Sequence, residues 1–141
     1  MSPDGAFVYV TGYSFGRGSD LDYATIAYDA SSGSRRWVSR YNGPGNGGDS
    51  AYGLGVAPDG SQVYVTGYSL GSGGVTEIAT VAYEASNGTR LWVRRYDSVA
   101  GLGALALSLA VDPLGSAVFV AGGTEGSTSG SDYATVAYST T

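Results

Sequence analysis

Short runs of alternating apolar and polar or small residues recur along this chain, separated by turn residues. Alternation with a period of two places successive side chains on opposite faces of an extended strand, so it predicts β-strands. Pro-Asp-Gly, Ser-Gly and Asn-Gly motifs lie between the runs and favour turns, because glycine and asparagine tolerate a positive φ. No window has a convincing helical period. The fold class is therefore predicted to be all-β.

The alternating runs belong to a tandem repeat of 55 residues. The motif at residues 3–5 (Pro-Asp-Gly) recurs at 58–60 and, as Pro-Leu-Gly, at 113–115, which gives intervals of 58 − 3 and 113 − 58. The same interval separates three glycines, three tyrosines and two tryptophans: Gly12, Gly67 and Gly122; Tyr28, Tyr83 and Tyr138; Trp37 and Trp92. A fixed period of this kind is the signature of a repeat architecture.

Each full period is predicted to hold four strands. The first is expected at 50–57 and 104–112; the second at 7–13, 62–68 and 117–123; the third at 23–29, 78–84 and 133–139; the fourth at 35–41 and 90–96. Four-stranded units repeating at this interval are typical of β-propeller blades. The chain is thus predicted to be one blade array of about two and a half blades, with a partial blade at 1–49, a blade at 50–103 and a partial blade at 104–141.

The first strand of the period is expected to be buried on both faces. Strict alternation would place one set of small residues and one set of large residues on opposite faces: Ala51, Gly53 and Gly55 against Tyr52, Leu54 and Val56. Neither set is charged, as expected for a blade between two neighbours. Small residues would suit the innermost strand, where blades crowd a central axis.

The segments around the two tryptophans carry a family resemblance. YDASSGSRRW at 28–37 and YEASNGTRLW at 83–92 resemble the tryptophan-docking motif of quinoprotein-like propellers. Together with PDGxxVYVTGYS and DYATVAY, they are similar to bacterial PQQ-like or SBBP-type β-propeller repeat proteins. The resemblance implies an extracellular or cell-surface bacterial protein, usually without enzymatic activity, in which Trp37 and Trp92 lock neighbouring blades together. Binding of the quinone cofactor is not inferred from this resemblance, since the chain has no cysteine and too few blades.

Composition excludes several function classes. The formal net charge of −5 argues against nucleic acid as a partner, and the chain contains neither histidine nor cysteine. Disulfides, thiolate zinc sites, Cys or His nucleophile systems and a histidine general base are therefore excluded. No apolar run is long enough to span a membrane, and no secretory signal is recognised. No residue is assigned a catalytic, cofactor-binding or metal-binding role, and the start inside a repeat motif suggests a trimmed or fragmentary chain.

The loops between the second and third strands of each period, at 15–22, 70–77 and 125–132, differ between copies and are the expected ligand-binding surface. The first of them contains Asp20 and Asp22, which could hold calcium or could be solvated loop carboxylates.

Other motifs have a structural interpretation beside a functional one. The glycine-rich stretch 42–49 is interpreted as a flexible connection, since it lacks the lysine of a phosphate-binding loop. Asn87-Gly88-Thr89 matches a glycosylation sequon but fits a hairpin turn better. Arg40 and Arg95 recur at the same place on the fourth strand. They are interpreted as members of structural ion pairs, with an anion-binding site as the alternative. Most of the tyrosines are expected in blade contacts rather than on a sugar-binding surface.

The favoured function is a non-catalytic scaffold or interaction module. An isolated array would expose an apolar face and an unpaired edge strand at each end, and such surfaces drive association. The partners are therefore expected to be further copies of the chain, or the remaining blades of a longer chain. Two alternatives stay open: a fragment of a quinoprotein-like or hydrolytic enzyme whose catalytic residues lie elsewhere, and a self-assembling ring or filament subunit.

Overall fold

The computed structural model describes residues 1–98, 100–128 and 130–141. These residues form ten strands and no helix, so the predicted all-β class is confirmed. The strands are β1 (Phe7–Phe15), β2 (Leu21–Asp29), β3 (Arg35–Tyr41), β4 (Asp49–Val56), β5 (Gln62–Leu70), β6 (Thr76–Glu84), β7 (Arg90–Tyr96), β8 (Ala104–Val111), β9 (Ala117–Gly126) and β10 (Gly130–Ser139). Within the described ranges there is accordingly no helix of a length and hydrophobicity that would cross a membrane.

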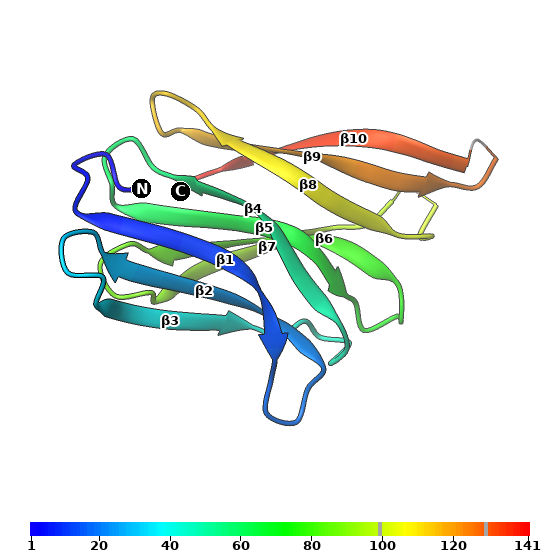
Figure 1. Ribbon diagram of the computed structural model, residues 1–141. Helices are drawn as coiled ribbons and strands as arrows, with labels where there is room; N and C mark the ends of the chain where they lie inside the picture. Colours follow the sequence, from blue (N-terminus) through cyan, green and yellow to red (C-terminus); the bar gives the residue numbers. More distant parts are fainter. Residues whose placement is uncertain (99, 129) are drawn as a thin grey trace.

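The strands form three antiparallel sheets in which chain neighbours pair. The first sheet has the order β1-β2-β3, the second β4-β5-β6-β7 and the third β10-β9-β8. Figure 1 shows the four-stranded sheet lying between the two three-stranded sheets. Strand β4 contacts β1 and β2 on one side and β8 on the other, so the second sheet is covered on both faces.

The hairpins between the second and third strands of the period are longer than predicted. β1 and β2 stay paired up to Phe15 and Leu21, and β5 and β6 up to Leu70 and Thr76. The predicted long loops at 15–22 and 70–77 therefore shrink to five residues each, closed by hydrogen bonds from Gly16 N to Asp20 O and from Gly71 N to Val75 O. The sequence pattern does not predict this extra pairing, because the side chains in these segments are polar and the strands are joined by backbone hydrogen bonds alone.

In the third copy, pairing reaches Gly126 and Gly130. The predicted loop at 125–132 is thus also mostly strand. One of its residues, Ser129, lies outside the described residues, as does Val99 in the predicted second blade.

A β-bulge overturns the predicted division of strand β4 into a small and a large face. The pairing of β4 with β5 shifts between Ala51 and Gly53, and that of β8 with β9 shifts at the same point of the repeat. Because the bulge inserts one residue into the alternation, Ala51 packs toward the first sheet together with Leu54 and Val56. Gly55 faces the third sheet, where an added β-carbon would lie 2.8 Å from the Val111 Cγ2 atom.

Glycine at position 67 is required by this bulge. A β-carbon there would lie 2.0 Å from the Ser50 carbonyl oxygen, and one at Gly122 would lie 1.9 Å from the Leu105 carbonyl oxygen. Gly12 occupies the same position of the repeat, but nothing lies within 4 Å of the β-carbon it would carry. The recurrence of glycine at 67 and 122 thus has a steric cause, whereas Gly12 is under no such constraint.

We expect Gly67→Ala to lower the free energy of unfolding by at least about 1–3 kcal/mol, because backbone atoms must move to admit the methyl group. Gly12→Ala is the matched control and should be neutral or stabilising by about 0.5 kcal/mol, since alanine reduces the entropy of the unfolded chain. Urea unfolding followed by circular dichroism measures both changes. Equal effects of the two substitutions would contradict the assignment of the clash to the bulge.

Candidate functional site: the interface between the sheets

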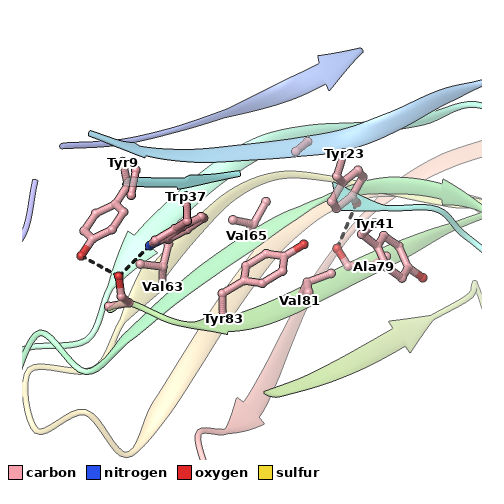
Figure 2. Packing of buried hydrophobic residues seen from close by; sticks show 12 residues of the cluster. Tyr9, Tyr23, Trp37, Tyr41, Val63, Val65, Ala79, Val81 and Tyr83 are labelled. Carbon is pink, nitrogen blue, oxygen red and sulfur yellow. Dashed lines mark hydrogen bonds between the residues drawn. The ribbon is translucent and has the colours of Figure 1, made fainter. Parts of the chain in front are cut away.

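An aromatic cluster fills the space between the first and second sheets (Figure 2). It consists of residues from both sheets: Tyr9, Tyr23, Ala27, Trp37 and Tyr41 from the first; Ala51, Val63, Val65, Ala79, Val81, Tyr83 and Ala85 from the second. Burial of aromatic side chains supplies the largest apolar area per residue available to this chain. Trp37, Tyr9, Tyr23 and Tyr41 of this cluster also make polar contacts with the second sheet.

Trp37 docks on the turn between β6 and β7. Its indole Nε1 donates a hydrogen bond to the Ala85 carbonyl oxygen at 2.9 Å, and the Tyr9 hydroxyl reaches the same oxygen at 3.5 Å (Figure 2). The Trp37 ring lies directly on Gly88, where a β-carbon would be 2.7 Å from ring carbons, and Ser39 Oγ donates to the Gly88 carbonyl. Trp37 therefore joins the first sheet to the second at this contact.

The docking turn is built by its own sequence. Gly88 has a φ of 75°, which the turn requires, and its N–H donates to the Glu84 carbonyl. The Asn87 side chain donates to Glu84 Oε2 and accepts from Thr89 N. The hairpin-turn interpretation of the Asn87-Gly88-Thr89 motif is therefore confirmed.

Two tyrosines of the first sheet make the second polar contact region. Tyr23 is fully buried, donates its hydroxyl to the Ala79 carbonyl oxygen at 3.1 Å and meets the Tyr41 ring edge-on. Burial raises the pKa of Tyr23 well above its ordinary value. The hydroxyl therefore stays protonated and remains a donor to the neighbouring sheet.

Arg95 links the two sheets through its guanidinium group. Within its own sheet it pairs with Glu77 Oε2 at 2.6 Å and donates to Ser69 Oγ at 2.8 Å; across the interface it donates to the Tyr41 hydroxyl. Desolvation acts to lower the pKa of Arg95, but the hydrogen bonds and charge interactions with Glu77 and Tyr41 together outweigh it and raise the pKa overall. The structural interpretation of Arg95 is thus confirmed.

The second and third sheets meet through the same positions of the repeat. Their cluster contains counterparts, 55 residues later, of the residues above: Tyr64, Ala82, Trp92 and Tyr96 on one side; Ala106, Leu109, Val111, Val118, Val120 and Tyr138 on the other. The Tyr64 and Trp92 rings lie 5.9 Å apart, close to the 6.0 Å between Tyr9 and Trp37. One sheet-on-sheet interface is therefore formed twice in this chain.

The two copies differ at the tryptophan. Trp92 Nε1 is buried without a hydrogen-bond partner among the described residues, whereas Trp37 Nε1 is paired. The Arg94 guanidinium lies 5.5 Å from the Trp92 ring centroid, in a cation–π contact. Trp92 thus packs between the sheets without the indole-to-carbonyl bond.

The structure separates the two aspartates proposed for calcium. Asp22 is buried in β2, accepts a hydrogen bond from Ser19 Oγ at 2.8 Å and lies 3.8 Å from Arg40 Nη1. Asp20 is exposed in the loop. In the ranges that the structure describes, no three carboxylates gather as a metal site would need. Arg40, Asp22 and Ser14 instead repeat the constellation of Arg95, Glu77 and Ser69, which confirms the structural role of Arg40.

The glycine-rich connection 42–49 is anchored, not loose as predicted. The buried Asp49 carboxylate accepts hydrogen bonds from Gly43 N at 2.7 Å and from Leu70 N at 3.0 Å. A carboxylate that accepts two backbone N–H groups ties the connection to the β5–β6 hairpin. In the sequence, the feature that could have predicted this anchoring is Asp49, the single carboxylate at the end of the glycine-rich run.

Comparison with known proteins returns no match to this chain among family models, curated proteins or solved structures.

We expect Trp37→Phe to destabilise the protein by about 1–3 kcal/mol, since the Ala85 carbonyl loses its donor and the smaller ring leaves space. Trp92→Phe is the matched control and should cost less, because the Trp92 indole N–H has no partner to lose among the residues that the structure describes. Urea midpoints of the two variants give the comparison. An equal or larger loss in Trp92→Phe would show that the indole-to-carbonyl bond contributes nothing.

Arg95→Lys should remove the contacts to Tyr41 and Ser69 that a linear ammonium cannot reproduce. The expected loss of stability is about 1.5–3 kcal/mol, the usual range for hydrogen bonds to charged groups. Arg40→Lys, at the same position of an exposed copy, should cost less than about 1 kcal/mol. Thermal unfolding of both variants tests this, and a reversed order of the two losses would overturn the inter-sheet role of Arg95.

Proposed function

We propose that this chain is an array of β-propeller blades that serves as a non-catalytic scaffold. The observation that carries the proposal is the interface formed twice by residues 55 positions apart, with the same aromatic and aliphatic positions on each side. Each sheet presents one face as a docking surface and the other as its complement. Such a unit can be repeated without change, as a modular scaffold requires.

The relative placement of the strands supports propeller blades. β4 and β8, the first strands of their periods, contact each other across the second interface, and Gly53 and Gly55 permit the close approach. Trp37 and Trp92 lie on the fourth strand of the period, at the opposite edge of each sheet. Small residues at one edge and large aromatic residues at the other favour sheets that fan out around an axis.

The polar groups of the chain support a scaffold over a hydrolytic enzyme. Asp4, Asp59 and Asp112 lie in the turns between first and second strands, and hydrogen bonds there lower the pKa of each carboxyl. The side-chain hydrogen bond from Ser31, with those of Ser32, lowers the pKa of Asp29 to about 2. A general acid at neutral pH needs the opposite shift. These carboxylates are used in turn formation.

A secreted or cell-surface location is proposed from the resemblance to PQQ-like repeats. The exposed ends of the β1–β2 and β5–β6 hairpins, around Arg17 and Ser72, would then be the surface offered to a ligand.

A series of tandem copies of residues 50–104 tests the proposal. We expect the free energy of unfolding to rise with each added copy, because each adds one docking interface. At one copy number between about four and eight, binding of an apolar fluorescent dye should fall sharply, since a closed ring has no free sheet face. The same series carrying Trp92→Ser in every copy is the control and should lose the gain in stability. Dye binding that stays constant at every length would mean an open stack and would contradict the propeller assignment.

A further inference from the structure

No other described strand covers the two outermost sheet faces, and these faces correspond to the two sides of the repeated interface. The outer face of the third sheet carries Phe119, Tyr133 and Ala137, here called the tyrosine face. The outer face of the first sheet carries Val8, Val10, Ala24 and Ile26, here called the valine face. None of these seven residues is charged.

The tyrosine face repeats the side that carries the docking aromatics. Phe119 corresponds to Tyr64 one repeat earlier, and Tyr133 corresponds to Tyr23 two repeats earlier. Tyr23 is 0% exposed against the second sheet, whereas Tyr133 is 87% exposed. An aromatic residue that is buried at its equivalent position is thus presented to solvent, together with the 46% exposed Phe119.

The valine face repeats the side that receives the aromatics. Val10 is 44% exposed, while its counterpart Val65 is fully buried beneath the first sheet. Val10, Ala24 and Ile26 line a shallow apolar hollow on this face. The Ala24 carbonyl accepts Thr11 Oγ1 at 3.4 Å, as the Ala79 carbonyl accepts Thr66 Oγ1 at 3.3 Å. In the covered copy, the Ala79 oxygen also receives the Tyr23 hydroxyl, so Ala24 has the corresponding position open.

We propose that a second copy of this chain docks its tyrosine face on the valine face, with the Tyr133 hydroxyl donating to the Ala24 carbonyl. The proposal rests on the proposed function, because it continues the interface that joins the sheets within one chain. Ala30 and Gly33 correspond to Ala85 and Gly88, the residues of the turn on which Trp37 docks. They stay exposed in this contact, because the third sheet consists of β10, β9 and β8 and holds no described strand equivalent to the one that carries Trp37. The contact between copies is therefore weaker than the contact within a chain.

For copies that each hold the three described sheets, a closed pair fits the size of a propeller. Each copy supplies three sheets, and closed propellers have between about four and eight blades. One copy falls below this range and three copies exceed it, whereas two copies give six sheets. In a two-fold ring, the tyrosine face of each copy meets the valine face of the other, so both contacts are identical and no face stays open.

Sedimentation velocity over a dilution series measures the mass of the full chain. We expect twice the 14.3-kDa chain mass at high concentration, falling to the single-chain mass on dilution. Tyr133→Arg and Val10→Arg should each give folded monomers with unchanged circular dichroism. Leu114→Arg is the control: Leu114 is 90% exposed in a turn outside both faces, so this variant should associate as the wild type does.

Mixing the two monomeric variants decides whether the two faces meet each other. Tyr133→Arg keeps an intact valine face and Val10→Arg keeps an intact tyrosine face, so an equimolar mixture should form dimers through one intact contact. If Tyr133→Arg loses association but Val10→Arg does not, the two faces do not meet each other and the proposal is overturned. A mixture of the two variants that stays monomeric would overturn it as well. A wild-type monomer at every concentration would overturn it too and would assign the faces to further repeats of a longer chain. In that case a Trp37→Phe variant less stable than Trp92→Phe would leave the proposed function standing.

Discussion

The docking of the Trp37 indole on the β6–β7 turn is the interaction on which the rest of the architecture depends. It joins a large apolar ring to a backbone carbonyl, so it combines area burial with a directed hydrogen bond. The turn can receive the ring only because Gly88 has no side chain and takes a positive φ. Hydrogen bonding within each sheet does not determine how the sheets stack on one another. The Trp37 contact fixes the position of the first sheet on the second.

The remaining contacts between sheets follow the same logic, since most acceptors are backbone carbonyls. Tyr23 donates to Ala79, Ser39 to Gly88, and Tyr9 reaches Ala85. A carbonyl oxygen has two lone pairs, so it can accept a donor from another sheet beside its ladder bond, and the buried Tyr23 hydroxyl with its raised pKa remains a protonated donor. Side-chain identity on the receiving sheet therefore matters mainly through size. Many of the receiving positions are accordingly alanine, glycine or valine, while Tyr83 packs against the Trp37 ring.

Stacking in one direction distributes stability unevenly. The second sheet is covered on both faces and its strands β5 and β6 are buried over most of their length, whereas each outer sheet has one face that no other described strand covers. In a linear array of this kind, each unit is stabilised only by its neighbours. The outer sheets are thus expected to open first in hydrogen exchange. Any surface that covers them adds an interface of the kind already present.

The sequence by itself determined the all-β class, the 55-residue period and the position of every strand, because alternation and turn chemistry are local properties. It also identified Trp37 and Arg95 as structural, since both recur one period apart. Tertiary structure alone decided which groups receive them. The Ala85 carbonyl accepts the Trp37 indole, and the Tyr41 hydroxyl accepts Arg95, only because the two sheets lie against each other. It also decided the faces of β4, because the bulge at Tyr52 reverses an alternation that looks regular in the sequence. A bulge arises from the partner strand and the neighbouring sheet, and neither is encoded in the local pattern of β4.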